Sequence, residues 1–522
     1  EGEEAWTDVP FIQEAEKEDA DVAVVFPRPI VKGEHLRLRV SYKGDKVLTD
    51  MGEKNYAVLA RTGWYANLGF FTDPATFDLT YRVPLGNEII SVGDPVETRA
   101  EGKESVSVWK ATKPIQVAGF NYGKFRKREK TDEISGLGVE VWTNPGTPDV
   151  VREINAIFTG DAADTLSEGL VSGPTIGGGL GKVNTERLAE SALTDGLNSA
   201  RLFTTYFGPL PVSRVAITQQ SQWSFGQSWP ALIYLPYLAF LDGTQRQRIG
   251  LAQAKDFVDE VGFHEFAHQW WGHLLGWESY RDQWLSEGFA QFSAALALQH
   301  TKGWGAYDRF WREVRKQIVG KDPGNAFAPW QAGAITDGYR AASQRSPSAG
   351  FALIYEKGGY VLHMLRMAMF DGRAPEPDAH FIAMMKDFTA TYAGKNPSTA
   401  DFEAVVERHL VPSLDATRDG KIDWFFRQWV TGTEIPKLST NLKIDKAPDG
   451  WRIQGTVSQG EVGPDFHTLV PLYVELDKDK FAQVGLIPMV GTVSVPVDVV
   501  VKPPKKPRRA LVNARGEVLA RE

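Results

Sequence analysis

The sequence predicts a multidomain α+β protein in which a helical segment lies between two regions rich in β-strands, and three observations support this. Short alternations of apolar and polar residues, such as Phe77–Val83, recur before about residue 124 and again after Gly432. In between, apolar residues recur at helical spacing. Within this helical part, His264, His268 and Glu287 have the spacing of metal ligands.

A chain of 522 residues is long enough for more than one domain. We expect an N-terminal domain of antiparallel β-sheet over residues 1–130, whose alternations include Leu36–Val40 and Ser105–Trp109. Residues 131–435 are expected to form a second domain, in which helical spacing predominates. The renewed alternation in the last segment, 436–522, predicts a β-sandwich.

Two basic runs are expected to be surface segments. Lys124–Lys130 is interpreted as a solvated linker. Lys502–Arg509 contains three prolines, which favours an edge or surface segment over a nucleic-acid patch.

The segment His-Glu-Phe-Ala-His from His264 to His268 predicts a zinc site. Two histidines four residues apart lie on one face of a helix, so both imidazoles can bind one Zn²⁺ ion while Glu265 lies beside the metal. Eighteen residues separate His268 from Glu287, enough to end one helix and begin a second that directs Glu287 to the same ion. Two histidines and one glutamate leave a coordination position open, as catalytic zinc sites require.

The periodicity predicts where these helices begin and end. Apolar spacing predicts the first helix over Asp256–Leu275, with Gly276 as its stop, and a second helix that opens near Ser286. A metzincin site would need glycine and histidine three and six residues after the second histidine, and these positions hold other residues. His273 is therefore expected to be structural or to support a ligand.

At this point the sequence resembles a known family. The run His264–Gly272, followed by Trp284–Ala290, is similar to the gluzincin metallopeptidases of the aminopeptidase N family, and Tyr355-Glu356-Lys357-Gly358-Gly359 is a further match. In that family a tyrosine of this motif hydrogen-bonds the oxyanion of the tetrahedral intermediate, a role that the resemblance assigns to Tyr355. The resemblance implies a thermolysin-like α/β catalytic domain with a helical extension. It also implies peptide substrates.

One departure from the family concerns the substrate's amino group. Family members carry Gly-x-Met-Glu-Asn before the zinc helix, and its glutamate holds that amino group. The matching stretch here contains Gln227, Ser228 and Trp229, and the alignment puts the glutamate position on Ser228 or, one residue later, on Trp229. Neither is acidic, and no acidic residue lies between Val212 and Leu241. Gln227 and Ser228 are expected in the substrate cleft, with the amino anchor lost or moved.

Composition excludes several classes of function. A net charge of −8 argues against a nucleic-acid partner. No window holds eighteen uncharged apolar residues, so no membrane span is expected. The absence of cysteine excludes disulfides and thiol catalysis and suits an exported bacterial protein, periplasmic or secreted. Because the family carries a longer β-rich domain and this chain starts at Glu1, we expect a processed form or a fragment with an incomplete first domain.

The sequence thus predicts zinc-dependent peptide hydrolysis. Glu265 would act as the base, Tyr355 would stabilise the oxyanion, and Asp282 would orient a zinc histidine. Three hypotheses stay open: an aminopeptidase with altered amino-terminus recognition, a peptidase that needs no free amino terminus and acts like an endopeptidase, and a non-catalytic zinc-binding scaffold. Side-chain preference and oligomeric state are not encoded in these patterns.

Overall fold

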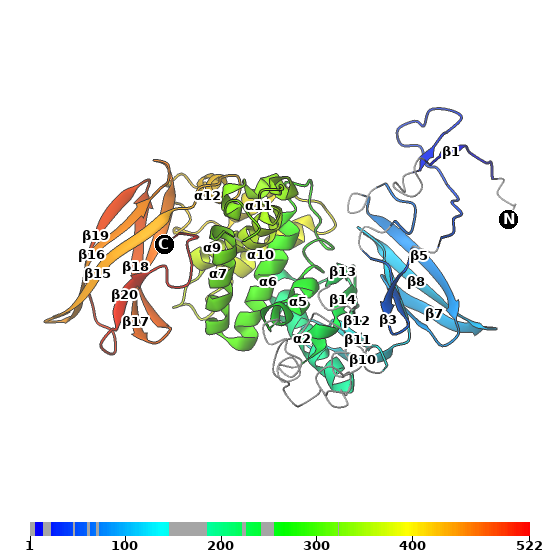
Figure 1. The fold of residues 1–522 in the computed structure, drawn as a ribbon, viewed down its shortest axis with the longest axis horizontal. Helices are drawn as coiled ribbons and strands as arrows, with labels where there is room; N and C mark the ends of the chain where they lie inside the picture. Colours follow the sequence, from blue (N-terminus) through cyan, green and yellow to red (C-terminus); the bar gives the residue numbers. More distant parts are fainter. Residues whose placement is uncertain are drawn as a thin grey trace, which may run out of the picture.

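The chain folds into a helical part flanked by β-sheets at both ends (Figure 1). The computed structural model describes residues 6–13, 22–44, 47–59, 63–68, 73–145, 185–221, 226–241, 255–321 and 323–521. The N-terminal sheets, coloured blue, and the C-terminal sheets, coloured orange and red, lie at opposite ends of the helices. This arrangement agrees with the predicted multidomain α+β class.

Two antiparallel sheets form the N-terminal end. One has the strand order β3-β4-β9-β6 and the other the order β5-β8-β7. Their strands are β3 (Thr49–Gly52), β4 (Asn55–Ala57), β5 (Ala75–Pro84), β6 (Glu88–Ser91), β7 (Asp94–Glu101), β8 (Glu104–Ile115) and β9 (Phe120–Gly123).

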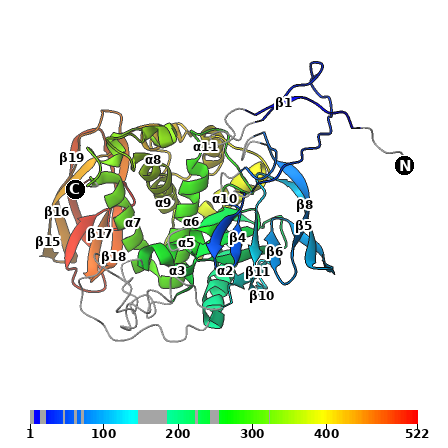
Figure 2. The same cartoon turned by 45° about the vertical axis from the view of Figure 1, so that its right-hand side comes forward.

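The predicted strand Leu36–Val40 is wrong. These residues belong to no strand, and the apolar side chains of Leu36, Leu38 and Val40 are exposed. The nearby hairpin of β1 (Phe11–Ile12) and β2 (Ala23–Val24) is exposed as well, and β1 projects from the sheets in both views (Figures 1 and 2). Alternation alone predicts a strand, but a strand also needs a neighbouring strand to pair with, and in the described residues none pairs with this segment.

A five-stranded sheet connects the N-terminal sheets to the helices. Its order is β10-β11-β12-β14-β13, with β11, β12 and β14 parallel and the two outer strands antiparallel. Its strands are β10 (Arg126–Thr131), β11 (Gly138–Thr143), β12 (Arg214–Gln220), β13 (Gln227–Trp229) and β14 (Leu232–Pro236).

The basic run Lys124–Lys130 is therefore largely a strand and not the predicted linker. Every residue of β10 is exposed, so the charges are solvated as expected, but the backbone pairs with β11 at the edge of the sheet. The charge of this segment correctly predicted that its side chains are exposed, but charge does not indicate whether the backbone pairs with another strand. The predicted boundary at residue 130 lies inside β10.

Both faces of the five-stranded sheet are covered, which explains why its central strands are almost continuously buried. Ile233 and Leu235 of β14 face the helices, whereas Leu232 and Tyr234 pack in a second cluster with the N-terminal sheets. Alternate residues of one strand thus belong to two cores, and the sheet holds the helical part and the N-terminal sheets together.

Residues 300–435 are largely helical, in agreement with the helical spacing expected between the two β-rich regions. A π-helix, η4, lies directly before α9 in the chain. The helices outside and inside this range are α2 (Thr185–Phe207), α3 (Tyr237–Phe240), α5 (Lys255–Ala267), α6 (Trp284–Lys302), α7 (Trp304–Val319), η2 (Pro329–Gln331), η3 (Ile335–Ala341), α8 (Ala349–Phe351), η4 (Ala352–Lys357), α9 (Gly358–Met369), α10 (Ala379–Tyr392), α11 (Thr399–Arg408) and α12 (Asp423–Trp429).

The C-terminal end consists of two three-stranded antiparallel sheets, β15-β16-β19 and β18-β17-β20. Ile453 and Val497 of one sheet and Val470 and Ile487 of the other share one apolar cluster. The strands are β15 (Lys437–Ala447), β16 (Gly450–Gly460), β17 (His467–Asp477), β18 (Lys480–Val490), β19 (Val493–Val501) and β20 (Arg509–Val512). Apolar residues of both sheets thus pack in a shared core.

A buried histidine joins the helices to the C-terminal end. His363 of α9 donates from Nε2 to the carbonyl of Arg515 (3.0 Å), and Tyr307 of α7 donates to its Nδ1 (2.9 Å). The ring also stacks on Trp311, with centroids 4.6 Å apart. Both ring nitrogens are satisfied in the neutral form, and burial lowers the pKa of His363 to about 3.

This neutral histidine predicts acid sensitivity. Since the folded-state pKa lies below the ordinary value of 6.5, the unfolded chain binds an extra proton between these values, and stability falls as the pH drops below 6.5. We expect His363→Gln to remove up to about 1.4 kcal/mol per pH unit of this loss. Urea unfolding of both proteins at pH 6.5, 5.5 and 4.5 measures the difference, and parallel pH dependences would contradict the assignment.

Candidate metal centre

The two histidines lie where α5 ends. His264 is in the last turn of α5, and His268 follows Ala267, the last residue of this helix. The amide of His268 still donates to the carbonyl of His264 (3.3 Å), so the one-turn spacing of the side chains is kept. The predicted continuation to Leu275 is wrong, because Gly272 has a φ of 115°, a value that no α-helix contains.

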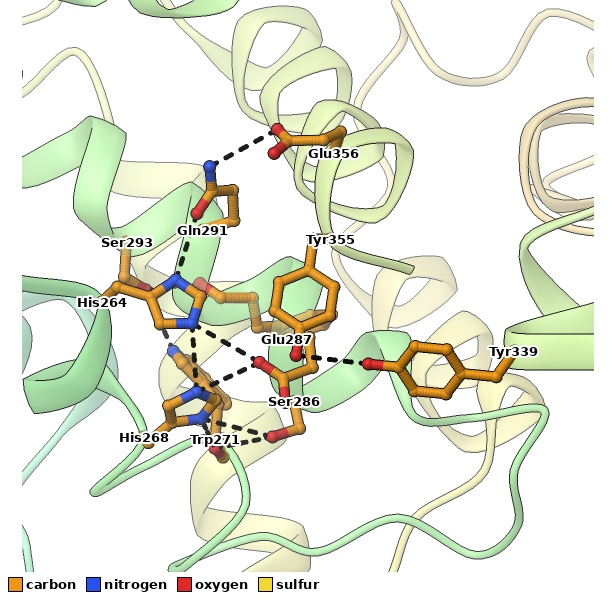
Figure 3. A network of polar contacts seen from close by, with 11 residues as sticks. His264, His268, Trp271, Ser286, Glu287, Gln291, Ser293, Tyr339, Tyr355 and Glu356 are labelled. Atoms are coloured by element: carbon orange, nitrogen blue, oxygen red, sulfur yellow. Dashed lines mark hydrogen bonds and ion pairs between the residues drawn. The ribbon is translucent and has the colours of Figure 1, made fainter. Parts of the chain in front are cut away.

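The structure brings together the three predicted ligands. Nε2 of His264 lies 3.4 Å, and Nε2 of His268 3.2 Å, from one carboxylate oxygen of Glu287, and the two nitrogens are 3.2 Å apart (Figure 3). Bonds of about 2.0–2.1 Å in a tetrahedron around zinc would place neighbouring donors about 3.3 Å apart. The donor triangle therefore fits one zinc ion, and no other group of three or more such residues is found in the described part of the chain.

Charge explains how these groups share a buried site. Burial disfavours the charged forms, but the two histidines outweigh it and lower the pKa of Glu287 below its usual range. In the same way the charge of Glu287 overcomes the effect of burial and raises the pKa of His268 to about 9. A cation is thus favoured at the point where the three side chains meet.

Each histidine has a hydrogen-bond partner on its other nitrogen. Nδ1 of His264 is 3.1 Å from Oε1 of Gln291, and Nδ1 of His268 is 2.8 Å from the carbonyl of Trp271. The structure does not support the predicted role of Asp282. Its carboxylate instead accepts hydrogen bonds from Ser279 and from the amide and hydroxyl of Thr399 at the start of α11.

The sequence analysis missed Gln291, although a signal existed. It lies one helical turn after Glu287, on the same face of α6, where a side chain can reach the same histidine. Asp282 precedes α6, and nothing in its spacing from Glu287 fixed which way its side chain would turn.

Tyr355 lies on the π-helix η4 and points into the site (Figure 3). Its ring is nearly parallel to that of His264, with centroids 6.0 Å apart, and Phe351 stacks on its other side at 4.1 Å. Burial, and then the charge of Glu287, raise the pKa of Tyr355 above its usual value. The phenol therefore stays protonated and remains a hydrogen-bond donor.

Glycines allow the two motif segments to touch. A Cβ on Gly288, directly after Glu287, would lie 2.7 Å from the backbone carbonyl carbon of Gly358. Real Cβ atoms do not approach this closely, so α6 and the start of α9, directly after η4, meet backbone to backbone. This contact brings Tyr355 next to Glu287.

Glu265 lies beside the three ligands, without joining their cluster. Its side chain is buried, and burial raises its pKa above the ordinary value. The carboxylate approaches the backbone before β13 so closely that a Cβ on Gly226 would lie 2.6 Å from its Oε1. The potential base is therefore between the ligands and the edge strand of the sheet.

Ser228 and Trp229, the two positions that the alignment gives for the family's glutamate, differ in their surroundings. Trp229 is buried in the cluster shared with the N-terminal sheets, whereas Ser228 is partly exposed. Nε2 of Gln269 donates to the Ser228 hydroxyl (2.7 Å) and to the carbonyl of Trp229 (3.0 Å). Gln269, the residue after His268, thus holds β13 in place through two hydrogen bonds. Ser228 is on the side of β13 that faces the helices.

A single cleft of about 1090 Å³ contains these groups. His273 also borders it, and burial lowers the pKa of this histidine to about 3, so it is neutral, in agreement with a structural role. The predicted site residues that line the cleft are Gln227, Ser228, His264, Glu265, His268, Glu287 and Tyr355.

Comparison with known proteins identifies this segment. Residues 228–429 match the model of the peptidase family M1 domain. This part of the chain is an M1 peptidase domain. The predicted aminopeptidase N-like family is therefore confirmed, and with it the zinc metallopeptidase class to which the domain belongs.

Sequence relatives cover only part of the chain. Over 112 residues it is 31% identical to endoplasmic reticulum aminopeptidase 2 of Bos taurus, a match that spans 22% of this chain and 11% of that protein. The chain thus accounts for a small share of the length of this curated relative.

Solved structures with the same fold cover more of the chain. Aminopeptidase A of Legionella pneumophila, in complex with aspartic acid, matches with a TM-score of 0.58 and 13% identity over 91% of this chain and 48% of that chain. An M1 zinc metallopeptidase from Deinococcus radiodurans matches with a TM-score of 0.50 and 18% identity over 82% of both chains. In the described residues no helix has the length and apolar character needed to cross a membrane.

The backbone contact at Gly288 predicts a specific sensitivity. Gly288→Ala should destabilise the protein by about 1–3 kcal/mol, because the added methyl must push α6 away from Gly358. Gly305→Ala in α7 is the matched control, since only the end of the Arg309 side chain is nearby. The control should be neutral or slightly stabilising. Denaturant unfolding compares the two variants, and equal stability would contradict the contact.

Proposed function

We propose that the protein is a zinc-dependent, aminopeptidase-type metallopeptidase that recognises the amino end of its peptide substrate without the usual carboxylate. The observation that carries the proposal is the donor triangle of His264, His268 and Glu287, with edges of 3.2–3.4 Å. Its size supports one zinc ion per chain. Glu265 and Tyr355 lie on the borders of the same cleft.

The site residues divide the reaction between them. When bound, zinc supplies a Lewis acid that polarises the substrate carbonyl and makes water a stronger nucleophile. Glu265 takes a proton from the attacking water and passes it to the nitrogen of the leaving amine, for which its raised pKa suits it. Tyr355 donates its hydroxyl hydrogen to the oxyanion, where charge develops only in the transition state.

Ser228 carries the proposal of altered recognition. Its hydroxyl is neutral and accepts a hydrogen bond from Gln269. In the family to which the resemblance points, a glutamate at this position pairs with the substrate's ammonium group. A hydroxyl gives that ammonium a weaker partner than a carboxylate does, since hydrogen bonds between charged groups are the stronger ones. The free amino end therefore contributes less to binding than in the family.

A second candidate is a peptidase that needs no free amino terminus. The same neutral Ser228 favours it, because an acylated nitrogen can lie beside a hydroxyl without leaving a buried carboxylate unpaired. The non-catalytic scaffold is disfavoured by the presence of Glu265 and Tyr355 around the ligand cluster, since zinc binding alone requires neither side chain.

Two substitutions test the catalytic assignment. Glu265→Gln should lower kcat by about 10²- to 10⁴-fold while zinc stays bound. Tyr355→Phe should lower kcat by about 10²- to 10³-fold. Tyr339→Phe is the control, because its hydroxyl contacts that of Tyr355 only at 3.4 Å and from the exposed side. Peptide hydrolysis and bound zinc are measured on each variant, and a Glu265→Gln protein that keeps a tenth of its activity would refute the mechanism.

Matched peptides with free and acetylated amino ends test the recognition. Ser228→Glu should raise the preference for free peptides, expressed as a ratio of kcat/KM values, by about 10- to 100-fold, because it restores a charged partner for the ammonium group. Ser228→Gln has the same length without the charge and should leave the ratio unchanged. Stepwise trimming of free peptides alone by the unsubstituted protein would show that an anchor lies elsewhere. Internal cleavage of acetylated peptides would establish the second candidate.

A further inference from the structure

A buried carboxyl group next to the oxyanion tyrosine has no part in the proposed mechanism. Glu356 follows Tyr355 on η4, and its side chain is buried. Among the residues that the structure describes, its hydrogen-bond partner is the amide of Gln291, at 3.4 Å (Figure 3). Burying a carboxyl group with one long hydrogen bond is unfavourable, so its position calls for a reason beyond stability.

Gln291 links this carboxyl group to a proposed zinc ligand. Nε2 of His264 faces Glu287 and His268, so a bound metal would use the lone pair of this nitrogen. Nδ1 must then carry the hydrogen and donate it to Oε1 of Gln291, 3.1 Å away. With its oxygen engaged, the amide of Gln291 has only N–H donors left for Glu356.

The hydrogen bonds therefore run in one direction, from Nδ1 of His264 to the oxygen of Gln291 and from the amide of Gln291 to Glu356. Because an oxygen of the carboxyl group accepts the Gln291 N–H at this contact, the amide oxygen stays directed at His264. A reversed amide would place its N–H groups against the N–H of the histidine. Glu356 thus selects the orientation of Gln291, and Gln291 selects the tautomer and ring orientation of His264.

We infer that Gln291 and Glu356 are positioning residues that hold His264 ready for the metal and couple it to the π-helix that carries Tyr355. The inference rests on the proposed zinc site and goes beyond it. The connection joins α5, α6 and η4, the three elements that meet at the site (Figure 3). A shift of η4 would therefore reach both the oxyanion donor and a metal ligand.

The test measures the metal directly. Gln291→Met keeps the size of the side chain but removes both hydrogen bonds, and should raise the zinc dissociation constant by about 10- to 100-fold in chelator competition. It should also change the visible absorption bands of the Co²⁺-substituted protein, which report ligand geometry. Glu356→Leu should weaken zinc binding and change the bands in the same direction. Glu356→Gln still offers an acceptor oxygen and should restore both values.

A matched control separates positioning from general loss of stability. Gln428→Met in α12 also removes a buried amide, one that exchanges two hydrogen bonds with the backbone of His467, far along the chain from the ligands. It should leave the zinc affinity and cobalt spectrum unchanged. Gln291→Met with the affinity and spectrum of the unsubstituted protein would overturn the inference, as would equal weakening by Gln428→Met. An unsubstituted protein that binds no zinc would instead refute the proposed function.

Discussion

The backbone contact between α6 and the start of α9, directly after η4, is the constraint on which the site depends. Glu287 comes from α6 and Tyr355 from η4, and only glycine at 288 lets the two backbones approach this closely. A side chain there would separate the proposed metal ligand from the proposed oxyanion donor. The π-helix contributes as well, because its wider turn changes which side chains of η4 face α6.

The spacing of residues along the helices was sufficient to predict the three proposed metal ligands. Histidines four residues apart lie on one face of a helix wherever that helix packs, and Glu287 needed only a second helix after a turn. Strand alternation served equally well at the C-terminal end, where two sheets bury alternate residues. These features depend on the sequence near each residue, so they could be predicted from it.

The features that sequence reasoning missed depend on distant partners. Asp282 bonds to Thr399, more than a hundred residues away, and Lys124–Lys130 becomes a strand edge because β11 lies beside it. Leu36–Val40 has the alternation of a strand but no paired strand in the described part of the chain. α5 ends early at Ala267, where the amides of Gln269 and Trp270 donate to carbonyls three residues back, and helical periodicity does not report this change.

The cleft contains the three predicted metal ligands and, near them, Ser228, where the family carries a glutamate. In the proposed function, the donor triangle, Glu265 and Tyr355 carry out hydrolysis, whereas Ser228 bears on which peptide ends are accepted. Because the proposal assigns hydrolysis and end recognition to different side chains, specificity could change while the chemistry is kept. Gln269 connects the two parts of the cleft, because it follows His268 in the chain and hydrogen-bonds to β13, the strand that carries Ser228.

The most direct measurement titrates zinc into metal-free protein while a peptide library is followed by mass spectrometry. The account predicts that hydrolysis rises in proportion to bound zinc, reaches its limit at about one ion per chain as one three-ligand site requires, and disappears with a chelator. A protein that binds one zinc ion through His264, His268 and Glu287 and leaves the whole library intact would contradict the account. That result would establish the non-catalytic scaffold in its place.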